Sequence, residues 1–117
     1  MISGWIDIRA ASLAALLFIG VTAVHASSEN TKALAIAKQN ACLGCHAINK
    51  KIVGPSFQDI AAKYKNNSSA NTALKNKIQK GGAGSWGVVP MPANPKLSEA
   101  DLSILVPWIL QGAPSND

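Results

Sequence analysis

The residues best suited to chemistry lie within a span of five positions, the segment CLGCH, which contains Cys42, Cys45 and His46. Thiolate sulfur and imidazole nitrogen bind soft or borderline metals, and a thiol can also form covalent bonds. Beyond residue 26, the one further soft side chain in the sequence is Met91. Any centre built from soft ligands in this part of the chain would have to use these residues.

Four kinds of site use two cysteines at this spacing. A redox dithiol belongs on a βαβ scaffold, for which the sequence offers no convincing strand. A disulfide that closes so small a loop would restrict the unfolded chain very little. A structural zinc site needs four ligands, more than the Cys and His residues of 27–117 supply. Covalent haem attachment, for which C-x-x-C-H is the known signature, fits best, and a disulfide is the main alternative.

In the haem interpretation, Cys42 and Cys45 lie on one face of a helical turn and each forms a thioether to a vinyl group. The next residue, His46, then binds the iron as the proximal ligand. Such a large apolar group would also supply core to a small domain.

Met91 is the candidate for the second axial ligand. A lone methionine more often fills a hydrophobic core, but here Pro90 and Pro92 hold its loop stiff and extended. A thioether favours ferrous iron and raises the reduction potential. Full coordination in both oxidation states would leave no position for oxygen or peroxide.

The N-terminus reads as a secretory signal peptide of residues 1–26. Arg9 precedes an uncharged apolar run over 10–24, and Ala26 ends a small-residue cleavage site. The run is shorter than the roughly 20 residues that span a bilayer, although an uncleaved anchor is the alternative. We therefore expect export to the periplasm and a single domain over residues 27–117, with no stable membrane insertion after cleavage.

The net charge of +5 arises from 11 basic and 6 acidic residues. A basic surface suits anionic partners such as proteins with acidic docking patches. Nucleic acid is disfavoured, because the lysines are scattered and the single arginine, Arg9, lies in the predicted signal. We expect a monomer.

Helical periodicity predicts an all-α fold with four helices. The first runs from about residue 30 to the cysteines, with Leu34, Ala37 and Ala41 inward. The others start at Ser56, at about residue 70 and at Ser98, and the two serines have an acidic residue three positions later as in a capping box. Pro107 lies inside the last helix, where it predicts a bend or a local 3₁₀ turn. Residues 81–96 are too rich in glycine and proline for a regular element.

The whole of 27–117 resembles the short bacterial class I cytochromes c. The matching segments are CLGCHAI at 42–48, KIVGPSFQDIAAKY at 51–64, GGAGSWGVVPMPANP at 81–95 and the terminal helix with Trp108. The resemblance implies a cytochrome c fold, with about four helices around one covalent haem c. It also implies a periplasmic carrier that passes electrons to a nitrite reductase, a terminal oxidase or a peroxidase, supplied by an upstream cytochrome complex.

The resemblance further implies roles for individual residues. Pro55 would orient His46, Trp86 would donate a hydrogen bond to a haem propionate, and Asn94 would hydrogen-bond the sulfur of Met91. The residues expected to line the haem pocket are Tyr64, Leu74 and Ile78. Trp108 would cross the first helix near Ala37 and Ala41, where the family tends to have an aromatic residue and a glycine.

The sequence thus predicts a monohaem electron carrier with His46 and Met91 as axial ligands, and not an enzyme. One alternative is a haem enzyme or ligand sensor in which Met91 is displaced, but residues 27–117 contain no second histidine and no arginine for peroxide chemistry. The other is a thiol oxidoreductase that uses Cys42 and Cys45.

Overall fold

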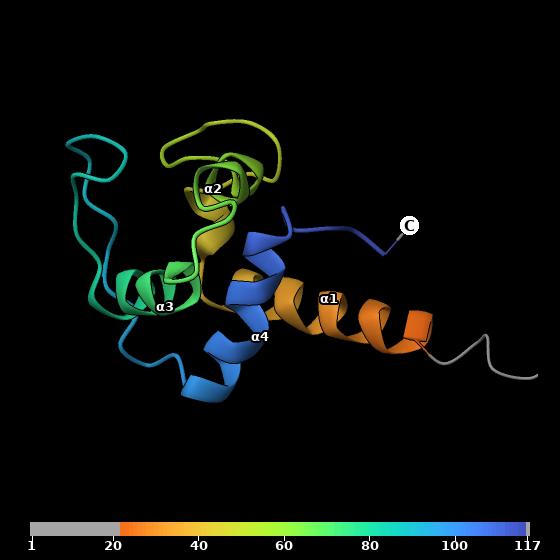
Figure 1. Ribbon diagram of the computed structural model, residues 1–117. Coiled ribbons are helices and arrows are strands. Elements are labelled where there is room, and N and C mark those ends of the chain that lie inside the picture. Colours follow the sequence, from red (N-terminus) through yellow and green to blue (C-terminus); the bar gives the residue numbers. More distant parts are fainter. Residues whose placement is uncertain (1–21, 117) are drawn as a thin grey trace, which may run out of the picture.

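The fold within residues 22–116, the part that the computed structural model describes, is all-α as predicted. It consists of α1 (Thr22–Gln39), the 3₁₀ turn η1 (Cys42–Gly44), α2 (Phe57–Lys63), α3 (Ala70–Lys80) and α4 (Glu99–Leu110) (Figure 1). No regular strand occurs in this range, where the extended pairs are the isolated bridges His46 to Lys51 and Gly82 to Met91.

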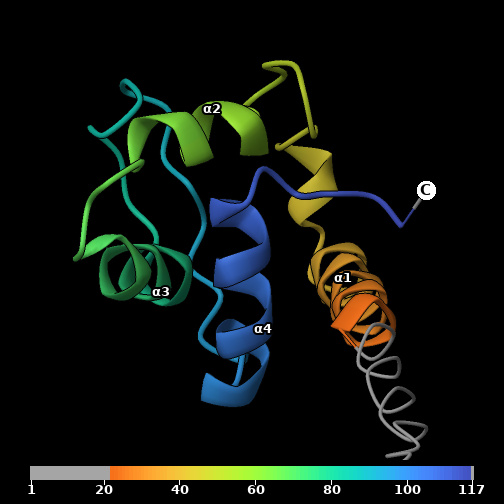
Figure 2. The ribbon, with the colours of Figure 1, turned by 45° about the vertical axis from the view of Figure 1, so that its right-hand side comes forward.

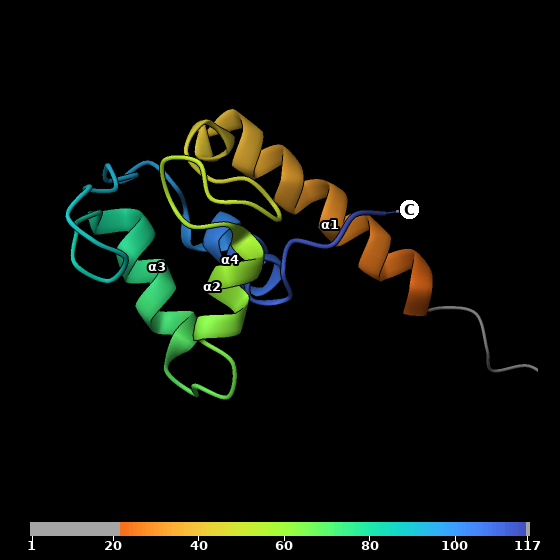
Figure 3. The same cartoon turned by 90° about the horizontal axis from the view of Figure 1, so that it is seen from above.

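Helix α4 is the centre of the molecule and contacts each of the other three α-helices. It lies between α1 and α3 in Figure 2, and α2 passes over one of its ends in Figure 3. Its buried residues are Leu102, Leu105, Val106, Trp108 and Ile109. One hydrophobic cluster joins these residues to the buried faces of α1, α2 and α3, so α4 fixes the relative positions of the elements around the site.

The predicted starts of α2 and α4 are confirmed by their N-caps. The hydroxyl of Ser56 accepts a hydrogen bond from the Asp59 backbone N–H at 3.0 Å. Ser98 and Asp101 form a full capping box, with the Asp101 N–H donating to the Ser98 hydroxyl at 3.0 Å. These bonds satisfy amides that a helix N-terminus otherwise leaves without partners.

Helix α1 differs from its prediction at both ends. It begins at Thr22 and ends at Gln39, and Ala33, Ile36 and Ala37 form its buried face. The prediction that Ala41 belongs to this face is wrong, because Ala41 is exposed and has a left-handed φ of 57°. The chain has to turn sharply there to pass from α1 into the 3₁₀ turn that carries the cysteines, and helical periodicity does not detect such a turn.

Most of the predicted signal peptide lies outside the described residues. The expected cleavage site after Ala26 falls within α1, which is continuous from Thr22, and cleavage stays a prediction. Among the helices of residues 22–116, none combines the length and the apolar character needed to cross a bilayer.

Pro107 is accommodated without a change of helix type. Helix α4 remains α-helical from Glu99 to Leu110, so the 3₁₀ turn considered at Pro107 does not form. The proline ring removes the N–H that would bond the Ser103 carbonyl, and Ser103 is exposed, which lets water take that bond. Trp108 next to it is buried, with its ring centroid 5.4 Å from that of Phe57, and its indole Nε1–H donates to the Pro114 carbonyl at 3.1 Å.

Candidate haem-binding site

The two cysteines and the histidine are presented by a single tight turn. Turn η1 spans Cys42–Gly44, and the His46 N–H donates to the Cys42 carbonyl at 2.9 Å. Cys42, Cys45 and His46 are half-buried and line the same cavity. The local fold therefore places both sulfurs and the imidazole at one wall, as the spacing predicted.

The orientation of His46 is fixed from two sides. Its Nδ1 lies 2.7 Å from the carbonyl oxygen of Pro55, and its ring stacks on Phe57 with the ring centroids 5.5 Å apart. A carbonyl can only accept a hydrogen bond, so Nδ1 must carry the proton. The neutral imidazole then has its lone pair on Nε2, the tautomer that binds a metal through that atom. Pro55 is therefore in hydrogen-bond contact with His46, and its predicted role in orienting a haem ligand stays a prediction.

Gly54 provides the room for this arrangement. A β-carbon at Gly54 would lie 2.7 Å from Cε1 and 3.0 Å from Nδ1 of His46. The Gly54 N–H also donates to the Cys45 carbonyl at 2.7 Å. The backbone before Pro55 therefore runs directly against the imidazole edge, an approach that any larger residue would block.

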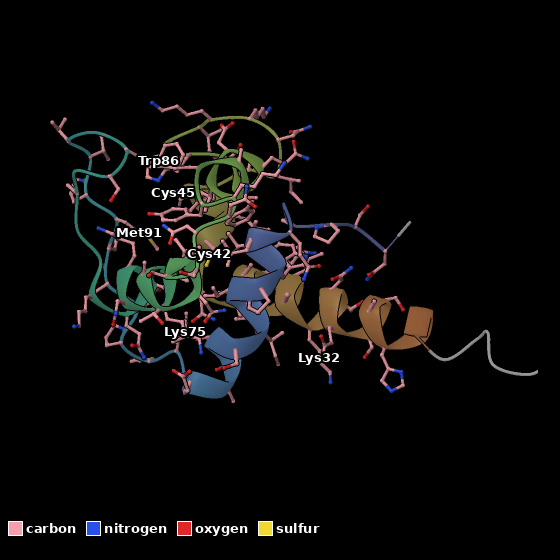
Figure 4. All side chains as sticks on the ribbon, viewed as in Figure 1. Lys32, Cys42, Cys45, Lys75, Trp86 and Met91 are labelled. Carbon is pink, nitrogen blue, oxygen red and sulfur yellow. The ribbon has the colours of Figure 1, made fainter. Side chains whose placement is uncertain are left out.

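The cavity beside His46 has a volume of about 380 Å³, within the range of roughly 300–1,000 Å³ typical of ligand sites. Tyr64, Leu74 and Ile78, predicted as pocket residues, all line it, and Leu105 and Ile109 of α4 contribute from the core. Figure 4 shows Cys42, Cys45, Trp86 and Met91 gathered at this end of the molecule, away from Lys32 on α1.

Met91 lies on another wall of the cavity, formed by α3 and the loop after it. Its backbone exchanges two hydrogen bonds of 2.9 Å with Gly82, and the Asn94 N–H donates to the Ile78 carbonyl at 2.9 Å. Its side chain is half-buried against the hydrophobic core. The methionine is therefore held near the end of α3 by its own backbone bonds to Gly82 and by the bond from Asn94 to Ile78.

Trp86 and Asn94 also lie at this side of the molecule. Trp86 lines the cavity and is 42% exposed, as suits a donor at the edge of a bound group. The side-chain amide of Asn94 donates to the Pro92 carbonyl at 3.3 Å. The bond from Asn94 to the Met91 sulfur, which the resemblance implied, stays a prediction.

Three contributors to the site escaped the sequence reasoning. Gly54 makes room for the imidazole, Phe57 stacks on it, and Lys63 reaches over the Trp86 ring at 4.2 Å from its centroid. All three lie within the segment 51–64 that carries the resemblance. The sequence gives no sign of the contacts of Lys63, because its partners are 22 and 23 residues away.

The chemistry of the cavity distinguishes between the possible uses of the cysteines. Burial raises the pKa of the Cys42 thiol, and the nearby Cys45 adds to this effect. Both cysteines are free, and no group of three or more Cys, His, Asp or Glu side chains within 22–116 converges as a metal site. A zinc site therefore does not fit. The apolar cavity, the two thiols and the imidazole at one wall and the thioether at another do fit a covalently attached haem.

Comparison with known proteins gives the same result. The sequence profile of the family described as Cytochrome c matches residues 30–113. Cytochrome c-552 of Nitrosomonas europaea is 42% identical over 110 residues, which cover 94% of this chain and 97% of that protein. Cytochrome c-551 of Pseudomonas aeruginosa is 40% identical over 73 residues, 62% of this chain and 69% of that one.

Solved structures extend the likeness to the fold. The crystal structure of the N. europaea cytochrome c552 superposes with a TM-score of 0.64 and 46% identity, over 68% of this chain and 98% of that one. The class 1 cytochrome MtoD of Sideroxydans lithotrophicus superposes with a TM-score of 0.63 and 27% identity, over 72% and 96%. The chain therefore belongs to the cytochrome c family of monohaem electron-transfer proteins, and its cofactor is covalently attached haem c.

Proposed function

We propose that the protein is a non-enzymatic, one-electron carrier in which Cys42 and Cys45 anchor the haem and His46 and Met91 bind its iron. The observation that supports this most directly is the 2.7 Å contact between Nδ1 of His46 and the Pro55 carbonyl oxygen, which leaves Nε2 for the metal. Met91 lines the same cavity from a separate wall, so one flat group between the walls could be bound by both.

The anchoring chemistry needs no oxidant. Each thiol would add across a vinyl group of the haem: the sulfur would bond to one vinyl carbon and the thiol hydrogen would go to the other. Burial raises the pKa of the Cys42 thiol, which favours the protonated thiol that such an addition would use. Cys42 and Cys45 on one short turn would hold the haem at two points.

The remaining residues hold the two axial ligands in place. The haem iron supplies the redox chemistry by taking up and releasing one electron. Pro55 and Phe57 keep the imidazole from turning, and the Gly82 bridge ties the Met91 backbone to the residues that follow α3. If both ligands stay bound in both oxidation states, the chain would need little rearrangement when the charge on the iron changes.

The absorption spectrum of the ferric protein tests this assignment. Methionine sulfur on haem iron gives a weak far-red band, which we expect in the wild type and expect to be absent in Met91→Ala. The reduced wild type should not bind carbon monoxide, whereas reduced Met91→Ala should bind it readily. Carbon monoxide binding to the native protein would instead identify a ligand sensor or haem enzyme, and unmodified cysteines in the mass spectrum would favour a thiol oxidoreductase.

We further propose that the chain is exported to the periplasm with cleavage after Ala26. The basis is the charged, apolar and small-residue pattern of the N-terminus. The intact mass of the purified protein should equal that of residues 27–117 plus one haem. A mass that includes residues 1–26 would show an uncleaved anchor.

Its partners, in this proposal, are redox proteins with acidic docking patches, such as a nitrite reductase, terminal oxidase or peroxidase, or the donor upstream of them. The chain carries a net charge of +5, and Lys51 and Lys77 are among the residues that line the cavity. Opposite charges accelerate encounter, and salt screens them. Electron-transfer rates that do not depend on ionic strength would contradict the proposed docking to acidic patches. Elution as a monomer in gel filtration is expected.

A further inference from the structure

The cavity lies between two walls that come from different parts of the chain. The His46 wall, residues 42–57, leads directly into α2, because Phe57 both stacks on His46 and is the first residue of that helix. The Met91 wall, residues 77–94, consists of the end of α3 and the loop that follows. Both walls pack on α4 at their base.

Residues 82–90 of the Met91 wall, here called the mouth loop, project beyond this base (Figure 1). Every residue of the mouth loop is exposed. Its backbone hydrogen bonds are the bridge that joins Gly82 to Met91, just beyond the loop, and a turn in which the Gly84 N–H donates to the Gly87 carbonyl at 2.8 Å. Neither of these attaches the mouth loop to the opposite wall.

Lys63, in the last turn of α2, makes that attachment. Its ammonium group donates a hydrogen bond to the Ser85 carbonyl and lies over the Trp86 ring, 4.2 Å from the centroid. These two contacts, one hydrogen bond and one cation–ring contact, join the mouth loop to α2. Within residues 22–116, both are made by the side chain of Lys63. Trp86, the target of the second contact, lines the cavity and appears beside α2 in Figure 4.

We propose that Lys63 is a positioning residue, a clasp that ties the mouth loop to α2 and so limits how far the Met91 wall can move from the His46 wall. Its effect on the iron rests on the proposed role of Met91 as a ligand. With the clasp closed, the conformation in which Met91 leaves the iron is rarer. Lys63 does not touch the reacting atoms and acts through Trp86 and Ser85.

The expected change in the affinity of a competing iron ligand follows from how exposed the contact between Lys63 and Trp86 is. Trp86 is 42% exposed, and a cation over an aromatic ring at an exposed site contributes an equilibrium factor of about two- to five-fold. The hydrogen bond to Ser85, also exposed, adds little to this. Loss of the clasp should therefore make a competing ligand bind two- to five-fold more tightly at the iron, since that ligand binds the state with Met91 displaced.

The test compares Lys63→Met, which keeps the aliphatic stem, with Lys63→Arg, which keeps the cation. Lys65→Met is the matched control: Lys65 is exposed, carries the same charge and makes no side-chain contact with the mouth loop. Imidazole is titrated into each ferric holoprotein at a pH where it is uncharged, and loss of the far-red band is followed. Amide hydrogen exchange at Gly84 and Met91 is measured in the same proteins.

Lys63→Met should bind imidazole two- to five-fold more tightly than wild type and exchange faster at Gly84, whereas Lys63→Arg and Lys65→Met should behave as wild type. In a Trp86→Leu background, adding Lys63→Met should have a smaller effect. Equal imidazole affinities and equal amide exchange rates in Lys63→Met and Lys65→Met would contradict the proposed role of Lys63. If the wild type lacks the far-red band, the ligand assignment of Met91 fails separately, and hydrogen exchange alone decides whether Lys63 holds the loop.

Discussion

Gly54→Ala tests whether the imidazole of His46 is held as tightly as the structure indicates. The added methyl carbon would lie 2.7 Å from Cε1 and 3.0 Å from Nδ1 of His46, and 3.3 Å from the Cys45 carbonyl oxygen. Carbon atoms in comfortable contact are roughly 3.5–4.0 Å apart. The ring would have to move by about 0.8 Å or more to restore that separation.

The ring has little freedom to make this movement. Its Nδ1 is hydrogen-bonded to the carbonyl oxygen of Pro55, the residue next to Gly54, and its face is stacked on the ring of Phe57. A shift that relieves the clash therefore weakens the bond to Pro55. Overfilling a packed site costs about 1–3 kcal/mol, and we expect the free energy of unfolding of the holoprotein to fall by that amount. At about 4–8 °C per kcal/mol for a domain of this size, the midpoint of thermal unfolding should fall clearly.

Gly44→Ala is the matched control, because it makes the same change inside the CLGCH segment where a β-carbon meets nothing within 4 Å. It should leave stability unchanged or raise it by about 0.4–1 kcal/mol, through the reduced freedom of the unfolded chain. Denaturant unfolding followed by far-ultraviolet circular dichroism gives both values. If Gly54→Ala is as stable as Gly44→Ala, the close approach of the backbone to His46 does not exist as described.

Three further substitutions test the elements that support the site, each by denaturant unfolding of the holoprotein. Ser56→Ala removes a buried N-cap and should cost about 1 kcal/mol; no loss would mean that the cap is not formed in solution. Trp108→Phe removes the hydrogen bond to Pro114 and should cost about 1–2 kcal/mol, with no cost if the C-terminal segment is detached. Pro107→Ala returns a backbone donor to α4 and should stabilise by about 1–2 kcal/mol, whereas a loss would show that the ring is needed for packing.

The sequence was most informative where structure depends on neighbouring residues. The caps at Ser56 and Ser98 and the bounds of α3, Ala70–Lys80, follow from residues within one helical turn, and the structure confirms them. The same holds for the turn that brings Cys42, Cys45 and His46 to one wall. In each case the determining contacts span four residues or fewer.

The sequence was less informative where a contact joins distant segments or where the backbone leaves a regular path. Ala41 fits the helical spacing of α1, but it takes a left-handed conformation because the chain has to turn toward the cysteines. Lys63 looks like any exposed lysine in the last turn of a helix until α2 and the mouth loop are placed side by side. Both features depend on the relative placement of elements, which periodicity does not encode.

The same arrangement explains why the cofactor site of this small domain is continuous with its hydrophobic core. Leu74, Ile78, Leu105 and Ile109 belong to the hydrophobic core and also line the cavity, so the core is continuous with the surface that a haem would cover. The two walls meet at α4 and are joined across the mouth by Lys63. A bound haem would therefore complete the core and the electron-transfer site at once, and any change that separates the walls should weaken folding and ligation together.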